Sequence, residues 1–99
     1  MSDEPQRWYV LLHEPIGSIG DGVFADPRFR LHVAFLGRLR AQGALVAAGP
    51  LDDRAGSGMA LLRGVDEDEA RRLAEEDESV RQGLFRVRVR PWTVVLSTV

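Results

Sequence analysis

The chain has no cysteine, no lysine and no apolar run that approaches the length of a membrane span. Without cysteine there are no disulfides, thiolate metal sites or thiol nucleophiles, a composition that fits an intracellular protein. The 13 basic residues, all arginine, do not outnumber the 15 acidic ones, so no basic excess favours nucleic acid. Since a bilayer span needs about 20 apolar residues and the N-terminus is polar rather than signal-like, we expect a soluble, cytoplasmic protein that binds neither nucleic acid nor a membrane.

A chain of 99 residues suits one domain with a single hydrophobic core. We assign residues 7–97 to that domain and residues 1–6 to a disordered N-terminal tail. A domain of this size leaves roughly a third of its unfolded surface exposed to water. Association of two copies would bury more of that surface, so size alone favours a homodimer.

Hydrophobic periodicity predicts four strands and two helices in the order β-α-β-β-α-β. The first helix is expected to have Asp26 as its N-cap and Pro27 at its first position, and to end at Gly43. The second is expected to begin at Asp66, where Glu69 completes a capping box. Right-handed crossovers fold this order into one antiparallel sheet with both helices on the same face, the ferredoxin-like α+β arrangement. The predicted strands cover residues 7–13, 44–48, 58–64 and 84–96.

Several predicted strands are apolar on both faces, although the helices cover only one face of the sheet. The stretches in question are residues 8–12, 45–48 and 94–96. A large exposed apolar surface marks a contact site. We therefore expect a second copy of the chain to cover the other face.

Two titratable residues lie where the helical periodicity requires apolar ones. At 100° per residue, His32 shares one arc of its helix with Phe35 and Leu39, and Asp77 continues the series that passes through Ala70. If the two meet, the carboxylate accepts from one ring nitrogen and leaves the other free to exchange protons. Two plainer interpretations stay open: a core histidine bonded to a backbone carbonyl, and a carboxylate that caps the turn at 78–82.

Five segments of the sequence form a pattern that covers nearly the whole chain. They are WYVLLHEP in the first strand, HVAFL from His32, LVAAGPL at 45–51, LAEED up to Asp77, and GLFRVRVRPW at 83–92. With these segments the chain resembles the YciI-like proteins, the YCII-related family within the dimeric α/β-barrel group. The resemblance implies a dimeric barrel and a proposed catalytic dyad of His32 and Asp77. The chain departs from the family pattern at Glu78, where proline is common, and at Phe29-Arg30, where many members have Arg-Pro.

The resemblance also suggests a class of reaction. One related member resembles a dehydrochlorinase that acts on a chlorinated hydroxyhydroquinone. We therefore expect a small homodimeric enzyme in which His32 is the acid/base and Asp77 orients it, for isomerisation of a small organic molecule or elimination from it. The alternative is a non-catalytic ligand-binding or structural dimer module. The substrate-binding candidates are His13, Gly49 and Pro50, which border the predicted pocket, and Arg88, as a cation.

The sequence predicts neither a metal nor a cofactor. His13-Glu14 lacks the second histidine of a metalloprotease helix, and Pro15 follows it. The glycines at 17, 20 and 22 have the wrong order for a dinucleotide-binding loop. The serines at 18, 57 and 79 lie in loops or turns without a nucleophile motif, so an acyl-transfer triad is poorly supported.

Overall fold

The computed structural model describes residues 5–99. The predicted tail, residues 1–6, lies mostly outside the described residues, and Gln6 already belongs to the first strand. The strands are β1 (Gln6–Pro15), β2 (Leu45–Pro50), β3 (Gly58–Leu62) and β4 (Phe85–Val94). The helices are the 3-10 helix η1 (Gly20–Ala25), α1 (Phe29–Ala41), α2 (Glu67–Ala74) and the single turn α3 (Glu78–Arg81). No helix in the described part of the chain is long and apolar enough to cross a membrane.

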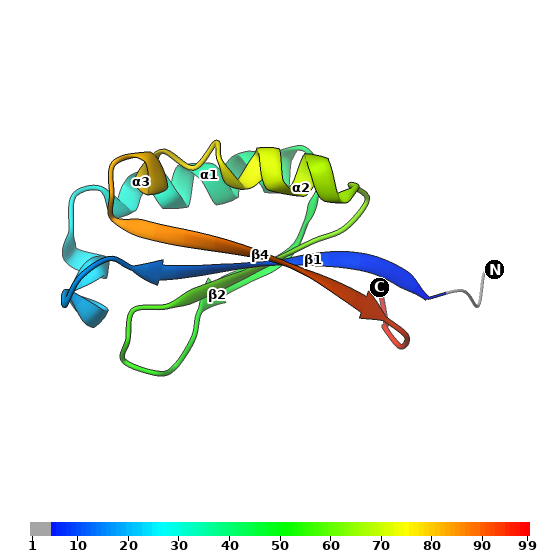
Figure 1. Ribbon diagram of the computed structural model, residues 1–99, viewed down its shortest axis with the longest axis horizontal. Coiled ribbons are helices and arrows are strands. Elements are labelled where there is room, and N and C mark those ends of the chain that lie inside the picture. Colours follow the sequence, from blue (N-terminus) through cyan, green and yellow to red (C-terminus); the bar gives the residue numbers. More distant parts are fainter. Residues whose placement is uncertain (1–4) are drawn as a thin grey trace.

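The four strands form one antiparallel sheet in the order β2-β3-β1-β4. Figure 1 shows α1, α2 and α3 together on one face of this sheet. The α+β ferredoxin-like arrangement predicted from the order of elements is therefore confirmed. The strand β4 lies at an edge, which is where Pro91 is tolerated because it has no backbone N–H to donate to a second neighbour.

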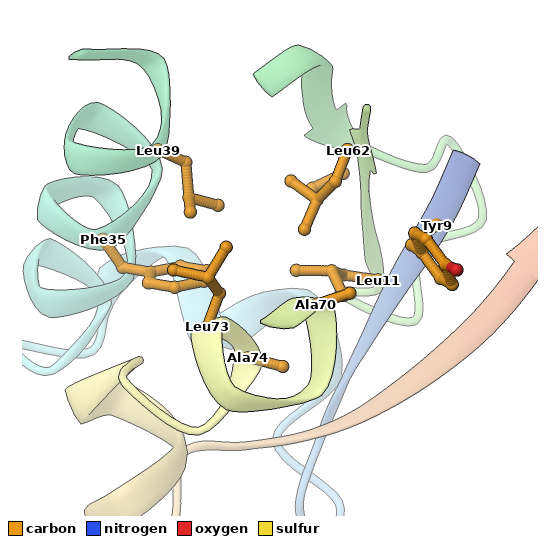
Figure 2. Packing of buried hydrophobic residues seen from close by; sticks show 9 residues of the cluster. Tyr9, Leu11, Phe35, Leu39, Leu62, Ala70, Leu73 and Ala74 are labelled. Atoms are coloured by element: carbon orange, nitrogen blue, oxygen red, sulfur yellow. The ribbon is translucent and has the colours of Figure 1, made fainter. Parts of the chain in front are cut away.

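The core lies between the helices and the inner face of the sheet. Successive side chains of a strand point to opposite faces, so Tyr9 and Leu11 point to the helices while Val10 and Leu12 point away. Figure 2 shows the inward side chains against those of α1 and α2. Each fully buried leucine or phenylalanine stabilises the fold by about 1.5–3 kcal/mol. The buried cluster is Tyr9, Leu11, Phe35, Leu39, Ala60, Leu62, Ala70, Leu73 and Ala74.

The start of α1 differs from the prediction. The helix begins at Phe29 with Arg28 as its N-cap, two residues beyond the predicted position, so Pro27 is not its first residue. Asp26 instead accepts from the backbone N–H of Arg28 at 2.8 Å and from its guanidinium at 2.9 Å. These hydrogen bonds, the side-chain one foremost, lower the pKa of Asp26 to about 2. The aspartate thus stabilises a local turn before the helix rather than the helix itself.

The second helix begins as predicted and ends sooner. The side chain of Asp66 accepts from the backbone N–H of Glu69 at 2.8 Å, which confirms the N-cap. The helix α2 then stops at Ala74, and Asp77 lies in the connection, where it is the N-cap of α3. In this connection Asp77 is fully buried, so its carboxylate lies in the interior.

The face of the sheet opposite the helices is open. Figure 1 shows α1, α2 and α3 all on the other side of the sheet. Trp8 packs edge-on against Trp92 there, with ring centroids 5.7 Å apart, and Trp92 is 43 % exposed. An open hollow of about 430 Å³ on this face is lined by Val10, Leu12, Met59, Leu61, Arg90, Pro91 and Trp92.

Candidate active site

Three titratable side chains from three parts of the chain meet beneath α1. His13 comes from β1, His32 from the first turn of α1, and Asp77 from the α2–α3 connection. All three are buried, with exposed fractions of 1 %, 7 % and 0 %. Strand alternation points His13 inward with Leu11, and helical periodicity points His32 inward with Phe35. The fold thus places polar groups where each local pattern alone would place apolar ones.

One oxygen of Asp77 contacts both imidazoles. Its Oδ2 lies 2.7 Å from Nδ1 of His32 and 3.0 Å from Nε2 of His13. The two rings are tilted against each other with centroids 4.4 Å apart. Because a carboxylate only accepts hydrogen bonds when ionised, both of these nitrogens carry a proton and donate to it. This fixes which nitrogen of each ring carries a proton toward the carboxylate.

The second oxygen of Asp77 is held by Ser79. Its Oδ1 accepts from the Ser79 hydroxyl at 2.7 Å and from the Ser79 backbone N–H at 2.9 Å. The carboxylate therefore caps α3 and contacts the histidines at the same time, which unites two interpretations left open by the sequence. Ser79 was not expected to contribute; the signal was Asp-x-Ser at a helix start, where aspartate accepts from the residue two positions on.

These contacts set the charge of the site. Burial alone would raise the pKa of Asp77, but hydrogen bonds from His13, His32 and Ser79 outweigh it and hold the pKa well below the usual range. Burial lowers the pKa of His13, and the neighbouring His32 lowers it further, against the opposing effect of Asp77. Asp77 is therefore ionised and His13 is neutral near neutral pH.

A pocket of about 50 Å³ opens beside the two histidines. The part of the chain that the structure describes has no buried side-chain nitrogen without a hydrogen-bond partner. Within residues 5–99 no hydrogen bond is made by Nδ1 of His13 or Nε2 of His32, so neither nitrogen is completely buried, and both residues line the pocket. The pocket is lined by His13, Phe24, Phe29, His32, Leu36, Gly49, Pro50, Gly56, Ser57, Gly58, Met59, Ala60 and Phe85.

Most of the predicted site residues come together at this pocket, and one does not. His13, Gly49 and Pro50 line it beside His32, while Asp77 lies behind the rings. Arg88 is not among the lining residues. It is paired in register with Leu12, so its side chain points to the open face, where it forms an ion pair with Glu14 at 3.1 Å.

Sequence reasoning missed the aromatic wall of the pocket. The rings of Phe85 and Phe29 lie 5.0 and 5.8 Å from that of His32, and Phe24 from η1 packs edge-on against Phe29. One signal was available: Phe29 precedes His32 by three residues and so shares its helix face. Phe24 and Phe85 arrive from segments far apart in sequence, which no local pattern connects.

The three titratable residues also bear on metal binding. His13, His32 and Asp77 each offer a nitrogen or oxygen atom, and these atoms lie within 4.8 Å of one another. In residues 5–99 they are the group that could hold a metal ion. In the structure the two nitrogens contact one carboxylate oxygen directly, at ordinary hydrogen-bond distances.

The fold and site together define a small α+β protein with a buried histidine–aspartate centre beside a mostly apolar pocket. The model of the YCII-related domain matches residues 25–93, and the chain belongs to that family. A search of curated proteins found no match.

A solved structure with a similar fold is the 5-chloro-2-hydroxyhydroquinone dehydrochlorinase TftG from Burkholderia phenoliruptrix AC1100, in complex with 2,5-dihydroxybenzoquinone. It is 20 % identical, with a TM-score of 0.66, over 87 % of this chain and 93 % of that chain. At this identity the likeness supports the fold, and nearly the full length of both chains takes part.

Proposed function

We propose that the chain is an enzyme that uses His32 and Asp77 for general acid/base chemistry on a small organic molecule. The observation that carries the proposal is the single carboxylate oxygen of Asp77, 2.7 Å from Nδ1 of His32, with Nε2 of the same ring accessible from the pocket. Such a contact fixes the tautomer and orientation of the imidazole. The reaction would be an isomerisation or an elimination of the dehydrochlorination type.

The pocket lining supports a small, flat and neutral substrate. Three phenylalanine rings and Pro50 form apolar walls, and the lining includes no charged arginine, aspartate or glutamate. In such surroundings a proton donor or acceptor acts more strongly on developing charge than it does in water. Hydroxylated quinones and enolisable carbonyl compounds have this shape and chemistry, and the similar dehydrochlorinase was solved with 2,5-dihydroxybenzoquinone.

The test compares turnover by wild type and His32→Gln over a panel of chlorinated hydroxyhydroquinones, halogenated phenols, lactones and enolisable acids. We expect His32→Gln to lower kcat by roughly 100-fold or more, the usual worth of a general acid or base. Arg30→Gln, an exposed change on the same helix, serves as the matched control. Equal turnover by wild type and His32→Gln would refute the role of His32. Ligand binding without turnover would favour the alternative, a binding module.

The proposed enzyme is a cytoplasmic homodimer. The open hollow around Trp92 is apolar, and a second copy of the chain would remove it from water. In sedimentation at micromolar concentration, we expect a dimer for wild type and for Val33→Arg, which alters an exposed position of α1, and a monomer for Trp92→Arg. A monomeric wild type would contradict the dimer. The cytoplasm is proposed because the chain has no cysteine.

A further inference from the structure

We propose that His13 is a second proton-transfer residue, and that the substrate binds between Nδ1 of His13 and Nε2 of His32. This inference rests on the proposed function and deepens it. It assigns the site two reacting nitrogens in place of one. It also defines the substrate class: a conjugated keto–enol or hydroxyquinone system that loses a proton at one atom and gains one at another.

The two imidazoles have the same kind of contact with Asp77 and the same position at the pocket. Each donates from one nitrogen to the same oxygen of Asp77, at 3.0 and 2.7 Å, and the ring centroids are 4.4 Å apart. Each ring therefore has its remaining nitrogen directed away from the carboxylate, and both residues line the pocket. A residue that only packed the core would not need its second nitrogen accessible. His13 thus has the same two attributes that support His32 as an acid/base.

The charges of Asp77 and the two imidazoles decide which histidine is the acid and which is the base. One carboxylate balances one imidazolium, and a second imidazolium at this separation would be repelled by the first. In the reacting form of the proposed site, the pair therefore carries one extra proton and not two. His13 is the more buried ring, and its neighbours in the sheet, Gly58 in β3 and Val87 in β4, offer no charge to stabilise a cation.

The titratable groups that face His13 in the described chain are thus His32 from α1 and Asp77 from the α2–α3 connection. His32 has the shorter contact with the carboxylate and is the more exposed of the two rings, so the proposal places the extra proton on His32. This makes His13 the base and protonated His32 the acid. The lowered pKa of His13 agrees with this assignment.

The resulting step conserves atoms and charge. Nδ1 of His13 removes a proton from a carbon or oxygen of the substrate, and the electrons of that bond move through the conjugated system to a second atom. Nε2 of His32 gives its proton to that second atom. The substrate is isomerised without a change in composition, and the extra proton has moved from His32 to His13. It returns to His32 by exchange with water before the next turnover.

The test uses the substrate found in the panel and compares wild type, His13→Gln and His32→Gln. We expect each variant to lower kcat by roughly 100- to 10,000-fold. The wild-type profile of kcat/KM against pH should be bell-shaped, with its acidic limb absent in His13→Gln. Imidazole added to His13→Ala should restore part of the rate, which a packing defect would not allow. The two-dimensional NMR spectrum of each variant reports whether it is folded.

The outcomes separate this inference from the function on which it rests. If His13→Gln keeps the wild-type rate and both limbs of the pH profile while His32→Gln is inactive, His13 is not a proton-transfer residue, and the proposed function stands. If the ring nitrogen shifts of wild type show a proton on Nδ1 rather than Nε2 of neutral His13, the inference is also wrong. If wild type turns over no member of the panel, the proposed function is wrong, and so is the inference that rests on it.

Discussion

Two aspartates make the same local hydrogen bond and lie in opposite surroundings. Asp26 accepts from the backbone N–H of Arg28, and Asp77 accepts from that of Ser79, in each case two residues on. The charged partner of Asp26 is that same Arg28, whereas the imidazoles that contact Asp77 come from positions 64 and 45 residues away. The same motif therefore stabilises a turn in one place and joins three elements in the other.

Because the two carboxylates are buried to different degrees, the loss of a hydrogen-bond partner has a different cost at each. Both have a lowered pKa, Asp26 through Arg28 beside it and Asp77 through hydrogen bonds that overcome its burial. The side chain of Asp26 is 15 % exposed and that of Arg28 is 39 % exposed, so water can replace a lost partner there. Around Asp77, which is fully buried, a lost partner leaves polar groups with nothing to bind. The comparison predicts large effects of substitution at one aspartate and small ones at the other.

The largest difference is expected on removal of each carboxylate. Asp77→Ala leaves two imidazoles and the Ser79 hydroxyl buried without their common acceptor, and should lower the free energy of unfolding by about 3–5 kcal/mol. Urea unfolding followed by circular dichroism measures this change. Asp26→Ala is the matched control, and its midpoint should move far less because Arg28 becomes solvated. Equal shifts in the two variants would show that burial does not distinguish the two sites.

A smaller effect is expected from the hydroxyl that positions Asp77. Ser79→Ala removes the 2.7 Å bond to Oδ1 but keeps the backbone N–H bond, so it should cost about 2 kcal/mol of unfolding free energy. It should also change the ring nitrogen shifts of His32, because the carboxylate is less firmly held. Ser57→Ala, a pocket residue without a contact to Asp77, should leave those shifts unchanged. A silent Ser79→Ala variant would contradict the positioning role.

The pH dependence of the free energy of unfolding should show that His13 is buried as a neutral imidazole. Its folded pKa lies below the unfolded value of 6.5, so the unfolded chain binds more protons as the pH falls through that value. The stabilisation is complete above the unfolded pKa and is lost on acidification. Between about pH 7 and about pH 5.5 the free energy of unfolding should therefore fall, because the unfolded chain takes up the proton that the buried imidazole does not. In His13→Gln, urea midpoints across this range should be flatter; an unchanged slope would argue against the buried neutral imidazole.

Local patterns in the sequence predicted which faces of the helices and strands are buried, but not where each helix ends. The buried series through Ala70 and Leu73 placed Asp77 inward although α2 ends before it. Glu75 and Glu76 are ordinary helix formers, so nothing in that stretch indicates the break, which arises when Asp77 caps α3.

Local sequence patterns also could not predict which segments contact one another in the site. His13 was placed near the pocket, but its contact with Asp77 depends on how β1 meets the α2–α3 connection. The aromatic wall depends in the same way on where η1 and β4 pack. Such long-range contacts are properties of the fold, and no single segment encodes them.

Salt should produce the smallest effect and the sharpest contrast between the two aspartates. Raising NaCl from about 0.05 M to about 1 M shortens the Debye length to about 3 Å, which screens charges in contact with water. The pKa of Asp26 should therefore rise slightly from about 2, because salt screens the charge of Arg28, whereas the hydrogen bonds from Arg28 that mainly lower this pKa remain; the carboxyl carbon shifts report the change. Asp77 is shielded from solvent ions, and its hydrogen bonds do not depend on ionic strength, so its carboxyl shift should stay that of an ionised group in the same acid titration. A rise at both residues would mean that salt reaches the centre of the site, and the carboxylate that joins the two histidines would then be no more protected than the partly exposed carboxylate of Asp26.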